Sequence, residues 1–436
     1  MTFNKAISAA ADFTQAEGSG EEPYSIDQII FSRTDKRGVI LSGNEVLRRL
    51  SGYSWDRLIG APHRILRNPD TPKVVFWMLW QTIQQDKPMV AYIKNRSARG
   101  GWYWVLSLVV PWEGGYFSAR IKPTGPLLAQ VTAIYAELLA AEASKSLPHE
   151  AVAALLLKRL ADLGFPSYHA FMCSALEQEL SARNIALGRS NATQARSLTT
   201  ITSNLKATEE KQKTLLLEFD ELQSIPTNMR IIASRLEPSG GPISAISDNY
   251  KFASTEISRR LEAFAGSESN LCHTMATDVA DALFLTGVAQ LLSEVPRQFA
   301  KEDHSQTPIE FSKEQAILSE VEFSFNTQAR AAVIRAEQVS GELNLASSEI
   351  RRMMLGLDTI RVMGRVESGR LGSSGVGLSS TIDQLDMRHA AISEHLQALM
   401  DLSASIKSAI TAYERTTSPS RESRSICFRL NAIQDR

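Results

Sequence analysis

The side chains that most often carry out chemistry are scattered along this chain of 436 residues. The histidines and cysteines share no metal-ligand or nucleophile spacing; they are His63, His149, His169, His273, His304, His389, His395, Cys173, Cys272 and Cys427. The chain contains no HExxH motif, no GxxxxGK[ST] phosphate loop and no Ser/His/Asp signature, which hydrolases and nucleotide-dependent enzymes need. We therefore predict that the protein is not an enzyme and has no metal site.

The overall charge and the cysteine content narrow the class of protein further. The net charge is −1, and Lys and Arg form no block that would attract nucleic acid. The three cysteines form no CxxC pair, which favours a reducing cytoplasm. The longest apolar run, Tyr103–Trp112, is of strand length, whereas a spanning helix needs about 20 apolar residues. We expect a cytoplasmic protein without a transmembrane segment and without a nucleic-acid partner.

The elements that must position any site fall first in a tryptophan-rich domain. Five of the six tryptophans stand between Trp77 and Trp112, and Gly and Pro punctuate the same part of the chain. After a flexible tail at 1–23, residues 24–124 predict an α+β domain with a five-stranded antiparallel sheet and short helices. The predicted strands are Ile29–Arg33, Val39–Ser42, Met89–Asn95, Gly101–Trp112 and Gly115–Lys122, with a helix at Thr71–Gln85.

After Gly125 the composition changes to Ala, Leu, Glu, Ser and Arg, which is typical of helices. We predict a mostly α-helical bundle of coiled-coil hairpins in this half. Its parts are linker helices at 125–166, a first hairpin at 167–300 with its turn near 238–242, a second at 301–415 with its turn near 368–377, and a disordered tail at 416–436.

A seven-residue apolar repeat supports these hairpins. It comprises Ile201, Thr208, Leu215, Leu222, Met229 and Leu236 before the first turn, and Ile243, Tyr250, Ile257, Phe264 and Leu271 after it. Such a repeat predicts antiparallel helices that share a seam, with Pro226 interrupting the first arm. An ordinary amphipathic bundle gives a similar stripe. The seams predict a homodimer, or else a four-helix bundle within one chain.

Residues 24–124 resemble the PAS domain of bacterial aerotaxis receptors and related energy-taxis proteins. The matching segments are GNEVLRRLSGYSWDRLIGAPH (43–63), RNPDTPKVVFWMLW (67–80), VAYIKNR (90–96) and WYWVLSLVVP (102–111). The resemblance implies a bound flavin, FAD, whereas related PAS domains bind haem. Carried onto this sequence, the family pattern implies the cofactor-binding residues Asn44, Arg67, Asp70, Trp80 and Asn95.

Each of these residues also has a purely structural interpretation. Trp80 could stack on a flavin or fill the core, and Asn44 could bind the ring edge or cap a helix. Arg67 could pair with a phosphate or with Asp70. Haem needs an axial ligand, and His63 is the one histidine in this domain. A lone histidine on a loop more often hydrogen-bonds or faces solvent, so we expect flavin ahead of haem.

The helical half is similar to the cytoplasmic signalling hairpin of methyl-accepting chemotaxis proteins, with Thr227–Glu237 at the place of its tip. This implies a chemotaxis coupling protein and a histidine kinase as partners. We therefore expect a sensor of redox state, oxygen or a small ligand that relays its state through Lys122–Gly125 to a helical output. The alternative is an interaction scaffold whose PAS domain holds no cofactor.

Overall fold

The computed structural model describes residues 20–143, 147–189, 193–236, 240–266, 271–303, 307–372 and 376–417. The predicted tails at 1–23 and 416–436 therefore lie almost wholly outside the described residues. The chain divides into two compact units that do not follow its order. The first unit comprises 1–191 and 283–329, and the second comprises 192–282 and 330–436.

The first unit is built on the predicted five-stranded antiparallel sheet, which confirms the α+β prediction. The strand order is β2-β1-β5-β4-β3. The strands are β1 (Ile30–Asp35), β2 (Ile40–Gly43), β3 (Met89–Arg96), β4 (Trp102–Trp112) and β5 (Gly115–Ile121). Short helices lie between β2 and β3, namely α1 (Glu45–Ser51), α2 (Trp55–Leu58), the 3-10 helix η2 (His63–Leu66) and α3 (Lys73–Ile83).

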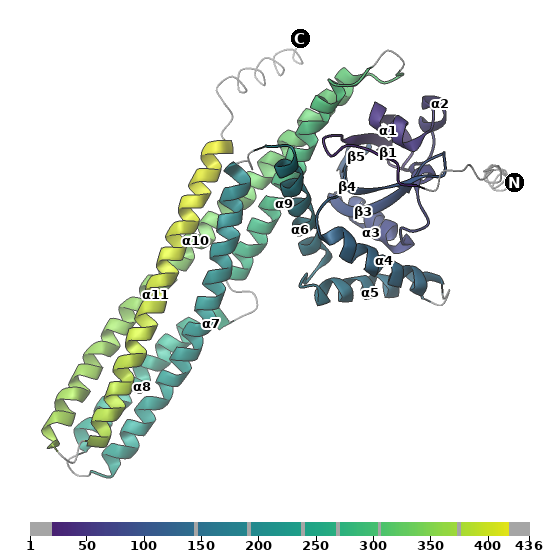
Figure 1. Cartoon of the computed structure of the whole chain (residues 1–436). Helices are drawn as coiled ribbons and strands as arrows, with labels where there is room; N and C mark the ends of the chain where they lie inside the picture. Colours follow the sequence, from purple (N-terminus) through teal and green to yellow (C-terminus); the bar gives the residue numbers. More distant parts are fainter. Residues whose placement is uncertain are drawn as a thin grey trace. The chain divides into compact units, whose positions relative to one another are not determined.

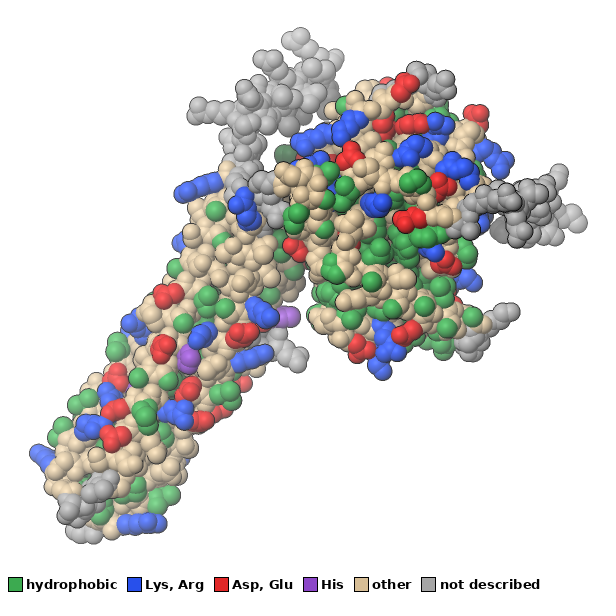
Figure 2. All heavy atoms as spheres, in the orientation of Figure 1, with side chains coloured by type: hydrophobic (Ala, Val, Ile, Leu, Met, Phe, Trp, Pro, Cys, Tyr) green, Lys and Arg blue, Asp and Glu red, His purple; other side chains and the backbone are tan. Residues whose placement is uncertain are grey.

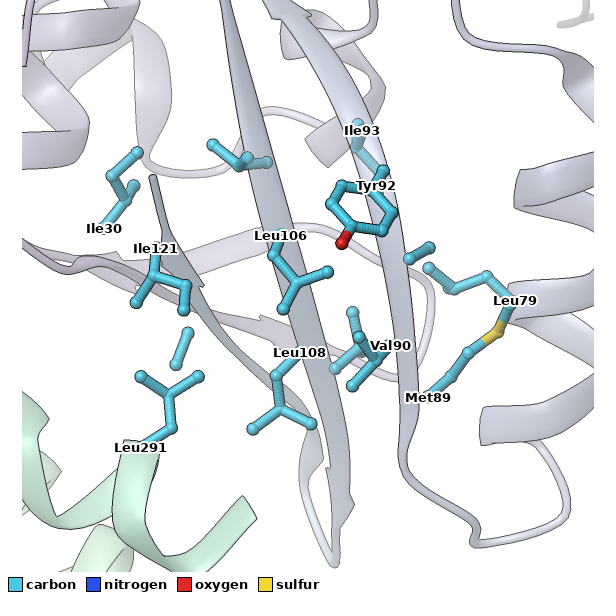
Figure 3. Packing of buried hydrophobic residues seen from close by; sticks show 14 of the residues in the cluster. Ile30, Leu79, Met89, Val90, Tyr92, Ile93, Leu106, Leu108, Ile121 and Leu291 are labelled. Carbon is cyan, nitrogen blue, oxygen red and sulfur yellow. The ribbon is translucent and has the colours of Figure 1, made fainter. Parts of the chain in front are cut away.

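Alternation along the strands gives the sheet two different faces. On β4, Ser107 and Val109 face a cavity that α3 helps to enclose, whereas Leu106 and Leu108 point to the opposite face. Figure 3 shows Leu291 beside these outward side chains and Ile121. The other helices of this unit are α4 (Leu127–Ala143), α5 (His149–Asp162), α6 (Tyr168–Ala186), the end of α9 (Leu271–Phe299) and the start of α10 (Phe311–Arg370).

The second unit is mostly helical, as predicted. It contains α7 (Thr193–Ser234), α8 (Gly241–Leu261), the π-helical turn η3 (Glu262–Gly266), the first part of α9, most of α10, and α11 (Val376–Thr417). The chain reverses direction between α7 and α8 and again between α10 and α11 (Figure 1). The repeat residues Ile201, Thr208, Leu215, Leu222, Met229, Ile243, Tyr250, Ile257 and Phe264 are buried, so the seven-residue pattern does mark the packed side of these helices.

The prediction that Pro226 interrupts the first arm is wrong. Helix α7 continues through Pro226 as far as Ser234. Proline cannot donate a backbone hydrogen bond, and it also obstructs the carbonyl one turn earlier. Here the carbonyl of Pro226 accepts a hydrogen bond of 2.5 Å from the Ser247 hydroxyl of α8, so the neighbouring arm contacts the helix at this residue.

Two surface properties bear on the predictions of partner and location. Lys and Arg side chains are interspersed with Asp and Glu over the face of the molecule seen in Figure 2, in keeping with the net charge of −1. One helical segment, Gly241–Phe299, contains an 18-residue window with a mean hydropathy of 1.3, and half of that window is buried inside the structure. A core helix of a soluble protein has the same length and composition, so this is weak evidence for a membrane span.

Candidate ligand-binding site

A cavity with a volume of about 70 Å³ lies between the inner face of the sheet and helix α3. This volume is well below the about 300–1,000 Å³ of ordinary small-molecule sites, so a ligand as large as a flavin ring requires the lining side chains to move apart. Helix α3 contributes side chains spaced three, four and seven residues apart, which places them on one face. They are Phe76, Leu79, Trp80 and Ile83. The strands contribute alternate residues, among them Ile93, Asn95, Ser107, Val109, Tyr116, Ser118 and Arg120.

The apolar wall of the cavity is aromatic. Trp80 meets Tyr116 edge to face, with ring centroids 5.5 Å apart. Gly38 stands against the indole in a left-handed conformation (φ 78°), and a Cβ atom there would lie 3.1 Å from Trp80 ring atoms. A larger residue would therefore be strained and would press on Trp80. This wall offers a flat apolar surface of the kind that a planar ring system needs.

The polar end of the cavity is built around Arg120, which is only 2% exposed. Its Nη2 donates to the Ser32 hydroxyl at 3.1 Å and lies 2.5 Å from His63 Nε2. Its Nη1 is buried and has no hydrogen-bond partner among the described residues. No acidic side chain pairs with this guanidinium in the described part of the chain, and burial lowers the pKa of Arg120 to about 10.

His63 belongs to this polar end, where it hydrogen-bonds with Arg120 and does not face solvent. It lies in η2 and lines the cavity. Burial, together with the nearby charges of Arg120 and Arg67, holds the pKa of His63 well below its usual value. The ring is therefore neutral at pH 7, and its Nε2 is the acceptor for Arg120.

Three of the five residues implied by the resemblance do line the cavity: Arg67, Trp80 and Asn95. Asn95 is 3% exposed on β3 and lines the cavity. The Arg67 guanidinium lies over the Phe76 ring, 4.0 Å from its centroid. Burial and the neighbouring Arg64 lower the pKa of Arg67. A backbone bridge joins Arg67 to Asn95, so the two are held together.

The other two implied residues, Asn44 and Asp70, are not among those that line the cavity. Asn44 is fully buried and caps α1: its Oδ1 accepts from the Leu47 amide at 3.2 Å and the Phe31 amide at 2.9 Å. Asp70 forms an ion pair with Lys94 at 2.6 Å, so the suggested Arg67–Asp70 pair is also wrong.

A second hollow adjoins the cavity and shares Arg67 and Phe76 with it. This groove has an empty volume of about 1890 Å³, open solvent included. Glu142 is the one acid in its lining. Five cationic side chains line the groove, namely Arg57, Arg64, Arg67, Lys73 and Arg96. Both oxygens of Glu142 already accept backbone amides at the start of α3. The groove therefore suits the anionic part of a ligand.

Sequence reasoning missed Arg120 and underrated His63, which together form the polar end. A usable indication was the alternation on β5, where Tyr116, Ser118 and Arg120 fall on one face of a strand whose other face is apolar. Among the described residues no group of His, Cys, Asp and Glu could hold a metal ion.

Comparison with known proteins agrees with this geometry. A family model described as PAS fold matches residues 40–114 and does not extend into the helical part of the chain. Over 128 residues the chain is 36% identical to the aerotaxis receptor of Escherichia coli (strain K12), covering 28% of this chain and 25% of that protein. Over 83 residues it is 32% identical to the nitrogen fixation regulatory protein of Klebsiella oxytoca, covering 19% of this chain and 17% of that protein.

The matched region thus spans a quarter or less of the length of these curated relatives. Among solved structures, the PAS domain of a protein from Colwellia psychrerythraea is 24% identical with a TM-score of 0.20, covering 22% of this chain and 86% of that one. A fungal LOV domain photoreceptor is 19% identical with a TM-score of 0.19, covering 23% of this chain and 75% of that one.

Proposed function

We propose that this PAS domain binds FAD and that the protein is a cytoplasmic sensor of redox state, oxygen or a small ligand. The observation that carries the proposal is the buried Arg120, whose Nη1 lacks a partner at the polar end of an aromatic-walled cavity. An unpaired buried donor costs free energy, and an acceptor supplied by a ligand removes that cost.

The lining fits the two ends of an isoalloxazine ring. The ring has an apolar edge, which Trp80, Leu79 and Ile83 would cover, and a polar edge of carbonyls and nitrogens. The donors of Arg120 and Asn95 would hold that polar edge. A bound flavin supplies reversible redox chemistry, and a cation fixed beside it favours its more negative form.

The cationic groove supports FAD over a flavin without phosphate. Arg67 lines both hollows, so a ligand with its ring in the cavity has a route to the groove along this side chain. Arg64 and Arg96 on the groove suit a diphosphate, because guanidinium groups bind phosphate oxygens in pairs.

Haem is the weaker candidate. His63 is the histidine of the cavity, and its Nε2 lies 2.5 Å from a nitrogen of Arg120. A neutral histidine whose Nε2 accepts this hydrogen bond has no lone pair left on that atom for iron. A haem ligand would require His63 to leave Arg120, which would then lose one of its two partners.

We further propose that the helical half is the output, acting as a homodimer on a chemotaxis coupling protein and histidine kinase. The resemblance to aerotaxis receptors supports this. We propose Thr227–Glu237 as the tip that contacts these partners; it includes the end of α7, and Glu237 lies outside the described residues.

The absorption spectrum of the full chain tests the cofactor. We expect a yellow protein that releases FAD on heating, and a reconstitution with FAD that Arg120→Met weakens. A Soret band would replace flavin with haem. A colourless protein that takes up neither group would overturn the sensor proposal in favour of the interaction scaffold. Co-purification of coupling protein and kinase with the full chain tests the partners, and a failure to bind either would remove them.

A further inference from the structure

Strand β1 has a different neighbour on each face. Ser32 and Thr34 face the cavity: Thr34 lines it, and the Ser32 hydroxyl accepts from Arg120 Nη2 at 3.1 Å. Phe31 and Arg33 face the opposite way, because side chains alternate along a strand. These two residues contact the end of α9 and the start of α10, which belong to the same compact unit.

The contacts on this second face are specific. The Phe31 ring packs edge to face on Phe299 with centroids 5.3 Å apart. The Arg33 guanidinium donates to both oxygens of Glu314, at 2.6 to 3.0 Å. Both partners of this pair are largely buried, at 13% and 3% exposed side chain. A two-pronged pair of this kind fixes orientation as well as distance.

A third contact joins Glu302, which follows α9, to β1 through Asn44. One oxygen of Glu302 accepts from Asn44 Nδ2 at 2.7 Å, and the other accepts from the Glu45 amide at 2.8 Å. Asn44 is also tied to the backbone of β1. Its Oδ1 accepts from the Phe31 amide, and its Nδ2 donates to the carbonyl of Ile29, the residue just before β1. A displacement of β1 therefore changes the position of both groups that Glu302 holds.

We propose that residues 298–302 and 311–314, at the end of α9 and the start of α10, form a latch that is held on β1 by Phe299, Glu302 and Glu314, and that the occupant of the cavity sets its hold. A ligand acceptor that binds Nη1 of Arg120 would draw the guanidinium toward the ligand and strain the hydrogen bond from Nη2 to Ser32, and Ser32 lies between the two latch contacts on β1. Helices α9 and α10 leave the latch on either side, and each contains residues of both units. This route runs through β1 and is separate from the connection at Lys122–Gly125.

The inference rests on the proposed function, because it gives the ligand a way to affect the helices. Linkage then requires reciprocity: if the ligand loosens or tightens the latch, a latch substitution must change ligand affinity by the same factor. The experiment therefore measures the latch once without ligand and once with FAD.

The first arm uses hydrogen–deuterium exchange of the full chain. Ser32→Ala removes the acceptor of Arg120 on β1, and we expect exchange at least about threefold faster in residues 298–302 and 311–318. Ser107→Ala is the matched control: Ser107 is a buried serine of the same cavity whose hydroxyl pairs with Ser118 and not with β1. Equal exchange of the latch in the two variants would overturn the inference, whether or not any ligand binds.

The second arm adds FAD and measures both directions of coupling. In the wild type, FAD should change latch exchange at least about threefold, and Glu314→Gln should change the FAD dissociation constant by a matching factor. If FAD binds and neither quantity moves, the latch is wrong and the sensor proposal stands. If FAD does not bind, the sensor proposal fails, and the Ser32→Ala arm still decides whether the cavity and latch are coupled.

Discussion

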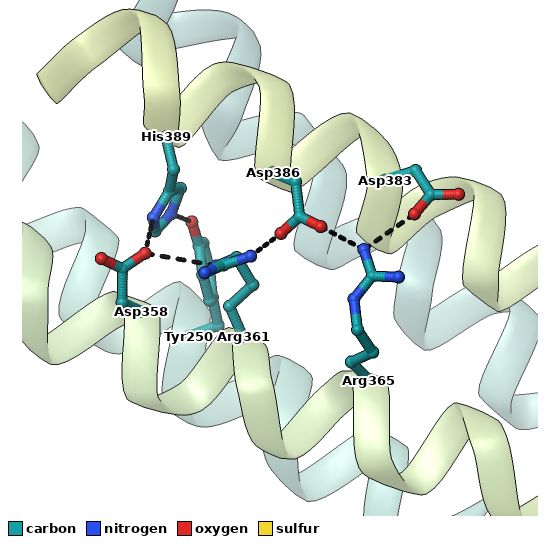
Figure 4. A network of polar contacts seen from close by, with 7 residues as sticks. All are labelled: Tyr250, Asp358, Arg361, Arg365, Asp383, Asp386 and His389. Carbon is teal, nitrogen blue, oxygen red and sulfur yellow. Dashed lines mark hydrogen bonds and ion pairs between the residues drawn. The ribbon is translucent and has the colours of Figure 1, made fainter. Parts of the chain in front are cut away.

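Tyr250 on α8 and His389 on α11 hydrogen-bond to each other inside the helical unit, 139 residues apart in the chain (Figure 4). The other ring nitrogen of His389 bonds Asp358 on α10 at 2.7 Å. Because burial lowers the pKa of His389, the ring is neutral at pH 7, with Nδ1 donating to the carboxylate and Nε2 accepting from the tyrosine hydroxyl. Ion pairs of Arg361 and Arg365 with acids of α10 and α11 extend this network along the helices.

Tyr250→Phe tests the hydrogen bond. The variant keeps the ring but leaves the buried Nε2 of His389 without a donor, which costs about 1–3 kcal/mol of unfolding free energy. Chemical denaturation followed by circular dichroism measures this. Tyr168→Phe in the other unit is a suitable control, because its hydroxyl makes only a longer bond of 3.2 Å to Val90 O. A loss no greater than in the control would contradict the assigned role.

The pH dependence of stability follows from the same group. Burial is the largest influence on the pKa of His389 and lowers it, although Asp358 opposes this. The unfolded chain, with a histidine pKa of about 6.5, therefore binds more protons than the folded chain just below that pH. Stability contributed by neutral His389 is complete above about pH 6.5 and decreases as the pH falls below it. His389→Gln should reduce the change of the denaturation midpoint between pH 7.5 and pH 5, whereas His273→Gln should leave that change as it is in the wild type.

Arg120→Met separates ligand binding from stability. Removal of a buried charge that has no acidic partner among the described residues stabilises the ligand-free protein, whereas loss of the donor to Ser32 and His63 destabilises it. Because the two effects oppose each other, we expect only a small change in the free energy of unfolding. A lost hydrogen bond to a charged group is worth about 1.5–3 kcal/mol, which corresponds to about 10–150-fold weaker FAD binding. Fluorescence titration with FAD and a thermal melt measure the two quantities. Arg37→Met, at an 83% exposed side chain, is the control.

Trp80→Phe tests the aromatic wall. The smaller ring loses contact area on a planar ligand, and aromatic pairs contribute about 0.5–1.5 kcal/mol, so FAD should bind about two- to tenfold more weakly. Trp77→Phe is the matched control on the same helix, because Trp77 does not line the cavity and stacks on His149. Equal affinities in the two variants would place the flavin elsewhere.

Glu294→Gln should be among the most destabilising single changes in the first unit, which contains the sheet. Glu294 pairs with Arg183 at 2.8 Å, and their side chains are 6% and 1% exposed. Loss of the negative charge leaves a buried cation uncompensated, which costs about 3–5 kcal/mol. Glu137→Gln removes one partner of the exposed pair with Arg159 and should cost less than about 1 kcal/mol. Denaturant titration compares the two, and similar values would contradict the argument.

Local patterns in the sequence were sufficient for much of the fold. Alternation and turn residues located the five strands, and the seven-residue repeat marked buried positions such as Leu215 and Tyr250. The resemblance supplied Trp80, Asn95 and Arg67, because the motif around them is contiguous or nearly so. Asn44 was ambiguous, since the asparagine that caps a helix and the asparagine that binds a ligand look alike in a sequence.

The remaining features depend on contacts between distant residues. An arginine in a strand, such as Arg120, is ordinarily exposed, and only the register of β5 shows that it faces inward. Glu302 and Glu314 lie 258 and 281 residues from Asn44 and Arg33, and each has the appearance of an ordinary helix-flanking acid. Pro226 was misjudged because a proline usually ends a helix, whereas α7 passes through it.

The outer face of the sheet is covered in part by residues of 283–329, which the chain reaches only after residues 192–282 of the second unit. A fragment that stops at residue 191 would retain every strand and the whole cavity, yet it would lack Leu291, Phe299 and Glu314. Its bared aliphatic surface would then invite self-association. Fusing this sensor to a foreign output would therefore require transplanting two separate pieces of polypeptide.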